Sequence, residues 1–208
     1  MGSTRDEMGR LLRDLGIRDQ QVLDAMARVP REEFVDEGHR DDAYGDHALP
    51  IGEGQTISQP YVVARMTELL EVAPTHRVLE VGTGSGYQAA VLSLLAADVV
   101  TVERHASLAE KARARLQRLG YTNVRVIRDD ASLGHPDAAP YDRILITAAS
   151  PKIDGALEAQ LRPPGGRIVA PVGDEEQQEL VVHLAGGREE RHGAVRFVLL
   201  RGAAGFRP

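Results

Sequence analysis

The stretch Val78-Leu79-Glu80-Val81-Gly82-Thr83-Gly84-Ser85-Gly86-Tyr87 decides the fold. It joins a short, mostly apolar strand, Arg77–Val81, to a glycine loop and then to a helix expected over residues 88–96. Glycines that follow a buried strand let the backbone approach a ligand without a clash from a Cβ atom. The stretch therefore predicts a strand, a ligand-binding loop and a helix in succession.

Strands and helices alternate along the chain beyond this loop. We expect further strands at residues 99–103, 124–127, 142–147 and 167–172, and helices at residues 108–119 and 153–161. This alternation is typical of an α/β fold with a doubly wound, mostly parallel sheet and helices on both faces. Residues that follow the apolar part of each strand are then expected at the carboxyl edge of the sheet, where ligands bind.

The last part of the chain has a different pattern. Strands are expected at residues 180–184 and 194–200, and only Gly186, Gly187 and a polar stretch separate them. The run Glu189-Glu190-Arg191 in that stretch is interpreted as a solvated turn. Because a connection this short suits an antiparallel pair and leaves no room for a crossover helix, we expect an antiparallel C-terminal hairpin.

The residues before the glycine loop are expected to form a helical extension. Asp19 is predicted to cap a helix over Gln20–Arg28, and Pro60 suits the first turn of another helix over residues 61–71. Residues 38–54 are rich in Gly, Asp and His and are predicted to form a long functional loop. No linker divides the chain, so one compact unit is expected.

Composition narrows the class of protein. The 208 residues are 42% hydrophobic and carry a net charge of −6, with no cysteine. The chain is long enough to bury its own core, and the lack of cysteine excludes disulfides and thiolate catalysis. An acidic balance disfavours nucleic acid as a partner, and no apolar run approaches the roughly 18 residues of a membrane span. The N-terminus lacks the apolar segment of a secretory signal, so we expect a cytoplasmic protein with no membrane partner.

The seven histidines show no metal-ligand spacing, so no metal is expected.

The acidic residues after the strands indicate a nucleoside ligand. Glu103 ends the second strand, 21 positions after Gly82, where doubly wound folds hold a carboxylate that accepts from ribose hydroxyls. Asp130 follows the third strand and could accept from an adenine amino group; an Asx turn is an equal alternative. Residues 84–89 also match the dinucleotide pattern G-x-G-x-x-A, which leaves a nicotinamide-dependent dehydrogenase open.

Two segments resemble known families. The tight run from Glu80 to Gly86 is similar to the loop of S-adenosylmethionine-dependent methyltransferases. The run Leu49-Pro50-Ile51-Gly52-Glu53-Gly54-Gln55-Thr56-Ile57-Ser58-Gln59-Pro60 closely resembles the signature of protein-L-isoaspartate O-methyltransferases. The resemblance continues at residues 29–37, 78–87, 146–149, 165–173 and 195–198, and covers roughly residues 8–200.

The resemblance implies an activity. Such enzymes transfer the methyl group of S-adenosylmethionine to the free carboxylate of L-isoaspartyl residues in damaged proteins and peptides, with S-adenosylhomocysteine as the product, and so begin repair through a succinimide. It implies a monomer and a single domain over residues 1–208. Residues 1–75 would be the helical and loop extension with the substrate loop, and residues 76–208 the cofactor-binding α/β core.

The resemblance also implies a set of site residues. Ser58 would be the active-site residue, donating a hydrogen bond to the substrate carboxylate; the alternative is that Ser58 caps the helix after Pro60. No general base is required, because a carboxyl group is already ionised at neutral pH. Residues implied in cofactor binding are Gln55, Thr56, Ile57, Ser58, Glu80, Gly82, Thr83, Gly84, Ser85, Gly86, Glu103, Arg104, Asp130 and Ala131. Residues implied in substrate binding are Leu49, Ile51, Ile57, Ser58 and Val172.

The chain departs from the family pattern at three positions. Asp129 and Ala131 stand where glycines are usual, and the Ala131 methyl group is expected where the adenine should pass, which would weaken cofactor binding. Leu199 replaces a proline and could extend the last strand. Two further functions stay open: another methyltransferase of this fold that acts on a metabolite or a dedicated biosynthetic peptide, and a protein that has lost cofactor binding.

Overall fold

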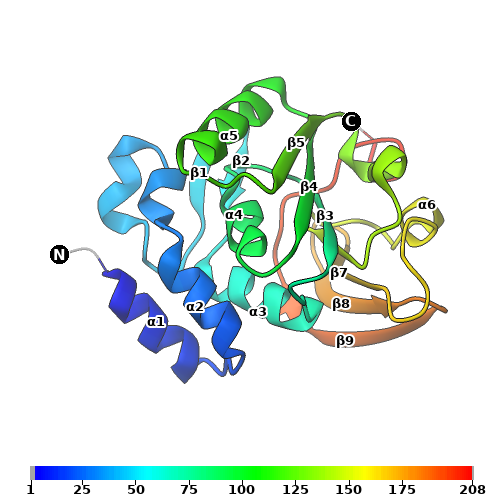
Figure 1. Cartoon of the computed structure of the whole chain (residues 1–208), viewed down its shortest axis with the longest axis horizontal. Coiled ribbons are helices and arrows are strands. Elements are labelled where there is room, and N and C mark those ends of the chain that lie inside the picture. Colours follow the sequence, from blue (N-terminus) through cyan, green and yellow to red (C-terminus); the bar gives the residue numbers. More distant parts are fainter. Residues whose placement is uncertain (1–2, 208) are drawn as a thin grey trace.

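A seven-stranded sheet forms the centre of the computed structural model, which describes residues 3–207 (Figure 1). The strand order is β5-β4-β3-β6-β7-β8-β9; neighbours from β5 to β7 run parallel, while β8 is antiparallel to both β7 and β9. The strands are β3 (Arg77–Val81), β4 (Asp98–Glu103), β5 (Val124–Arg128), β6 (Arg143–Ile146), β7 (Arg167–Gly173), β8 (Gln178–Leu184) and β9 (Arg188–Val195).

Helices cover the sheet, and a small hairpin lies outside it. The α-helices are α1 (Arg5–Asp14), α2 (Gln20–Arg28), α3 (Pro60–Leu70), α4 (Tyr87–Ser93), α5 (Ala106–Arg118) and α6 (Gly155–Glu158). Short 3₁₀ helices are η1 (Arg31–Phe34), η2 (Glu37–Asp42), η3 (Ala131–Leu133) and η4 (Pro136–Ala138). The separate hairpin pairs β1 (Leu49–Gly52) with β2 (Gln55–Ile57).

Neighbouring residues on the central strands enter opposite apolar clusters, because successive side chains of a strand point to opposite faces. Val78 packs in the cluster that includes side chains of α1 to α5, whereas Leu79 packs in the cluster that includes Leu157 of α6. Both residues are fully buried. Burial on both faces is characteristic of parallel strands, and the predicted doubly wound α/β fold class is confirmed.

The helix over Gln20–Arg28 begins as predicted, because the Asp19 carboxylate accepts hydrogen bonds from the amides of Gln21 and Val22. The loop predicted over residues 38–54 is more ordered than expected, since it contains η2 and β1. None of the described helices has the length and apolar character needed to cross a bilayer.

The helix predicted over residues 153–161 was too long. It ends at Glu158, because the next residues leave the helical path to pair beside the start of β6. There the Tyr141 amide donates to the Gln160 carbonyl at 2.8 Å, and the Arg162 amide donates to the Tyr141 carbonyl at 2.8 Å.

The last strand was also predicted wrongly. Gly186 and Gly187 both have positive φ and reverse the chain tightly, so that β9 starts at Arg188 and includes the run interpreted as a solvated turn. Charged residues are tolerated there because β9 is an edge strand with much of its surface in solvent. Leu199 does not extend β9; it forms an isolated bridge with Ala149.

Candidate active site

The main pocket lies at the carboxyl ends of β3, β4 and β6, where open α/β sheets bind ligands. The β1–β2 hairpin and the segment after β9 complete its wall. Its lining residues are Gln55, Thr56, Ile57, Ser58, Val63, Met66, Glu80, Gly82, Thr83, Gly84, Ser85, Tyr87, Gln88, Glu103, Thr147, Ala148, Phe197 and Val198.

The glycine loop needs its glycines at two positions in particular. Gly82 and Gly84 have φ of +99° and +53°, a region that side chains rarely allow. A Cβ atom at Gly82 would lie 2.5 Å from the Thr147 hydroxyl, which itself donates to the Gly82 carbonyl at 2.7 Å. A Cβ atom at Gly84 would lie 3.3 Å from Ile51 of the hairpin. The loop is therefore held tightly between β6 and β1.

Glu103 is joined directly to this loop. Its carboxylate accepts hydrogen bonds from the Gly84 amide at 2.9 Å and from the His105 amide at 2.9 Å, and the residue is buried. Each carboxylate oxygen has a further lone pair. Glu103 therefore shapes the loop and still presents acceptor capacity to the pocket.

Glu80 is a second buried acid on the pocket wall. It is 0% exposed, and the Thr101 hydroxyl donates to its Oε2 at 2.6 Å. Within residues 3–207 its Oε1 has no hydrogen-bond partner. Burial raises the pKa of Glu80 to about 8, and the charge of Glu103 adds to the rise, while the Thr101 hydrogen bond opposes it. At neutral pH this raised pKa keeps Glu80 protonated, so the unpartnered Oε1 is a polar atom on the wall with which a ligand can pair.

Ser58 connects β2 to α3, and its hydroxyl is not a helix cap. The N-cap residue of α3 is Gln59, which makes no capping hydrogen bond through its side chain. The Tyr61 amide instead donates to the Asp46 carboxylate at 2.8 Å. Among the residues that the structure describes, no side chain or backbone group is hydrogen-bonded to the Ser58 hydroxyl. The capping alternative for Ser58 is therefore wrong.

A groove adjoins the main pocket at Ser58. It is lined by Ala48, Thr56, Ser58, Gln59, Val62, Thr147, Arg196, Phe197 and Val198. Thr56, Ser58, Thr147, Phe197 and Val198 line both spaces. Ser58 therefore stands where a molecule in the groove would meet a molecule in the pocket.

The structure brings ten of the residues implied in cofactor binding together on the pocket wall. They are Gln55, Thr56, Ile57, Ser58, Glu80, Gly82, Thr83, Gly84, Ser85 and Glu103. Gly86 lies at the N-terminus of α4, off the wall. Arg104 and Asp130 line a separate hollow together with Arg128, Arg201 and Arg207.

The segment after β5 has an arrangement that the sequence left open. Asp130 forms the Asx turn, accepting from the Ser132 amide at 3.0 Å, and also accepts from the Ala203 amide at 2.8 Å. The Ala131 methyl group is buried in the apolar cluster beneath the sheet and lines neither the main pocket nor the hollow beside Asp130. Neither Asp129 nor Ala131 has a positive φ, so the backbone there does not require glycine.

Three residues implied in substrate binding line neither space. Leu49 and Ile51 are buried in β1, and Val172 sits beside the Ser150 bridge in β7. Residues of the main pocket that the sequence did not assign to it are Val63, Met66, Tyr87, Gln88, Thr147, Ala148, Phe197 and Val198. Phe197 and Val198 were detectable as part of a family-like motif, but the motif was interpreted as a strand. Met66 lies among the apolar residues of α3, so its pattern does not distinguish it from a core residue.

The chain is similar to known proteins over nearly its whole length. A family model described as Protein-L-isoaspartate(D-aspartate) O-methyltransferase matches residues 3–203. Protein-L-isoaspartate O-methyltransferase of Koribacter versatilis (strain Ellin345) is 56% identical over 200 residues, which are 95% of this chain and 90% of that protein. The protein of the same name from Roseiflexus sp. (strain RS-1) is 56% identical over 201 residues, 95% of this chain and 92% of the other. A solved structure of a protein-L-isoaspartate O-methyltransferase matches with a TM-score of 0.85 at 29% identity, covering 97% of this chain and 67% of that one. The chain therefore belongs to the protein-L-isoaspartate(D-aspartate) O-methyltransferase family.

Proposed function

We propose that this protein methylates the free carboxylate of L-isoaspartyl residues in damaged proteins and peptides, with S-adenosylmethionine as the methyl donor. Membership of the family supports this reaction. The observation that carries the assignment to this site is the position of Ser58, whose hydroxyl is not used as a helix cap and whose residue lines both the pocket and the groove.

The pocket residues suit the cofactor. The glycine loop lets backbone approach a nucleoside, and the Glu103 carboxylate supplies acceptors for its hydroxyl donors. The raised pKa of Glu80 keeps this residue protonated at neutral pH without a ligand, and a cationic ligand that displaces this proton would gain the unpartnered Oε1 as an acceptor. When bound, S-adenosylmethionine supplies a methyl group on a positively charged sulfur.

The residues of the enzyme then do not need to transfer a proton during methyl transfer. The substrate carboxylate is ionised at neutral pH, so no side chain needs to act as a base. Ser58 donates a hydrogen bond that orients the carboxylate in the groove toward the pocket. Phe197 and Val198 line the junction and exclude water, which favours a reaction in which opposite charges neutralise each other.

The methyl ester leaves the site more reactive than the acid. The backbone nitrogen that follows the esterified residue attacks the ester carbonyl and loses its proton, and methanol leaves as a succinimide ring closes. Hydrolysis of the ring returns some normal aspartate. These steps need no residue of the enzyme.

We further propose that residues 1–208 act as one methyltransferase domain, that the protein works as a cytoplasmic monomer, and that neither nucleic acid nor membrane is a partner. The net charge of −6 supports the exclusion of phosphate polymers.

The test is methyl transfer from labelled cofactor to an isoaspartyl peptide beside its normal aspartyl twin. We expect transfer to the isoaspartyl peptide alone. Equal transfer to both peptides would contradict the proposed specificity. Transfer to neither, with cofactor binding intact by calorimetry, would favour a same-fold methyltransferase that acts on a metabolite or a dedicated peptide.

A further inference from the structure

Arg31 carries a charge that is wholly buried next to the active site. It is the first residue of η1 and is 0% exposed. Its Nε donates to the Ala43 carbonyl at 2.6 Å, and its Nη2 donates to the Ser58 carbonyl at 2.6 Å. Within residues 3–207 no carboxylate lies within ion-pair distance of it, and its Nη1 has no partner. Burying a cation without an ion-pair partner costs folding free energy, which suggests that the Arg31 side chain is kept for a functional reason.

The same guanidinium also contacts the helix that follows the glycine loop. It lies over the Tyr87 ring, 4.7 Å from the centroid, in a cation–π contact. Tyr87 begins α4 and lines the main pocket. Arg31 therefore joins the Ser58 segment to the pocket wall on the cofactor side.

We propose that Arg31 is a positioning residue for methyl transfer, which holds the backbone of Ser58 so that its hydroxyl meets the substrate carboxylate. The proposal rests on the role of Ser58 in the proposed function. Ser58 follows the last residue of β2, so no strand pairing fixes its carbonyl, and the hydrogen bond from Arg31 is the one that the described residues make to it. The carbonyl carbon and the Cβ atom share one Cα atom, so fixing the carbonyl also restricts where the Cβ atom, and with it the hydroxyl, can lie.

The rigid shape of the guanidinium matters for this role. Its planar fork donates to two carbonyls at once, from the η2-to-β1 loop and from Ser58. Displacement of a reacting group by about 1 Å can lower a rate on the order of a hundredfold. The charge has a second effect, because a cation near the groove attracts the incoming carboxylate. Since methyl transfer neutralises that carboxylate, the charge assists peptide binding and does not lower the chemical barrier.

Two variants separate these effects. Arg31→Lys keeps the charge but loses the planar fork, so we expect kcat on the isoaspartyl peptide to fall on the order of tenfold with little change in KM. Arg31→Gln keeps a planar donor but loses the charge, so we expect it to raise the peptide KM as well as lower kcat. The calorimetric Kd for the cofactor should stay within about twofold for both variants, because Arg31 does not line the pocket.

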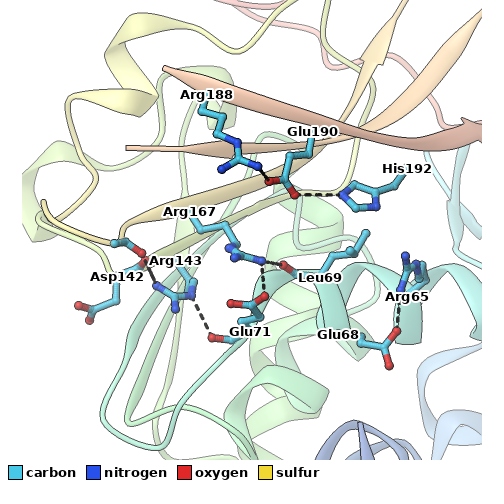
Figure 2. Close-up of polar contacts among 11 residues, drawn as sticks. Arg65, Glu68, Leu69, Glu71, Asp142, Arg143, Arg167, Arg188, Glu190 and His192 are labelled. Atoms are coloured by element: carbon cyan, nitrogen blue, oxygen red, sulfur yellow. Dashed lines mark hydrogen bonds and ion pairs between the residues drawn. The ribbon is translucent and has the colours of Figure 1, made fainter. Parts of the chain in front are cut away.

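Arg143→Lys is the matched control. Arg143 also donates to backbone carbonyls, those of Glu71 and Gly165, each at 3.0 Å, but at the amino end of β6, the opposite end of the strand from the pocket (Figure 2). We expect Arg143→Lys to lower the melting temperature while kcat stays within about twofold of the wild type. A similar loss of kcat in Arg143→Lys would mean that the effect of Arg31→Lys reflects stability alone, and would overturn the proposal.

A double-mutant cycle with Ser58→Ala gives the decisive result. If Arg31 acts through Ser58, Arg31→Lys should lower kcat in the wild type but not in the Ser58→Ala background. Equal losses in both backgrounds would overturn the proposal, as would unfolding of both Arg31 variants at the assay temperature. Turnover of the isoaspartyl peptide by the wild type tests the proposed function separately, so the two failures remain distinguishable.

Discussion

The Asp46 carboxylate accepts a hydrogen bond from the Tyr61 amide at 2.8 Å, so the first turn of α3 is capped from a loop 15 residues upstream. Asp46 also accepts from the Gln59 side chain at 3.3 Å. The helix start therefore needs nothing from Ser58, although serine is a common capping residue. Separate variants can test whether Asp46 caps α3 while Ser58 serves methyl transfer.

We expect Ser58→Ala to lower kcat on the order of a hundredfold, by analogy with the loss of an oxyanion-hole donor. Its melting temperature and cofactor Kd should hardly change, because the hydroxyl caps nothing. Asp46→Ala is the matched variant, and it should reduce the free energy of unfolding by about 1 kcal/mol through loss of the cap. Turnover and thermal melts of both variants check this. A Ser58→Ala enzyme that is destabilised but fully active would refute the assignment of Ser58.

The pH dependence of turnover should show no titration of a catalytic base. With saturating cofactor and peptide, we expect kcat to be flat around neutrality and to fall only as the substrate carboxyl group protonates, near pH 4. Rates between pH 3.5 and 8.5, with folding monitored at each pH, provide the measurement. A titration centred near pH 7 would reveal a catalytic base and contradict the proposed mechanism.

Glu80 should make the cofactor-free protein less stable as the pH rises. Burial raises its pKa to about 8 from an ordinary value of 4.5, so the folded state keeps a proton that the unfolded chain has lost. The contribution of Glu80 to stability is therefore complete below about pH 4.5 and is lost as the pH rises to about 8.

Glu80→Gln stays neutral and should remove this decline. We expect its melting temperature without cofactor to exceed that of the wild type by several degrees at pH 8.5, with the difference shrinking toward pH 4.5. Paired melts across this range provide the test. Identical pH dependence in the two proteins would show that the Glu80 pKa is not raised.

Glu103 should affect both the cofactor and the loop. Loss of hydrogen bonds to a charged acceptor costs about 1.5–3 kcal/mol, so Glu103→Ala should weaken cofactor binding roughly 10- to 150-fold by calorimetry. Because the carboxylate also accepts from Gly84 and His105, we expect this variant to melt lower than the wild type. Glu103→Gln keeps the shape and should melt closer to the wild type while still binding cofactor weakly. Unchanged affinity in both variants would remove Glu103 from the site.

Ala131→Gly tests the effect of a departure from the family pattern. The sequence suggested that removing the methyl group would leave binding equal or tighter. Since the structure places that methyl group in the apolar cluster, we expect an unchanged cofactor Kd and a loss of about 1 kcal/mol in the free energy of unfolding. Calorimetric titration measures the cofactor Kd of the variant, and denaturant unfolding measures its free energy of unfolding. A clear gain in affinity would mean that the methyl group does oppose the adenine.

Local patterns in the sequence predicted features formed by neighbouring residues, but not the contacts between residues that are distant along the chain. The strand Arg77–Val81 and its glycine loop were predictable, because buried apolar residues and glycines act within a few positions. The Asp46 cap of α3 was not, because Asp46 and Tyr61 meet only after the chain has folded between them. The contact between Arg31 and Ser58 spans 27 positions. It uses a backbone carbonyl, and because every residue has one, no residue type in the sequence indicates the contact. β9 was misplaced because an edge strand need not look apolar.

The charged strand β9 ends the sheet, and this matters for a protein that meets damaged chains. An unpaired sheet edge is a template on which another extended chain can add a strand and start co-aggregation. Arg188, Glu190 and His192 lie along β9 and pair among themselves (Figure 2). A foreign strand would have to displace or desolvate these side chains. The charge on β9 therefore disfavours the addition of a strand from a partly unfolded substrate at this edge of the sheet.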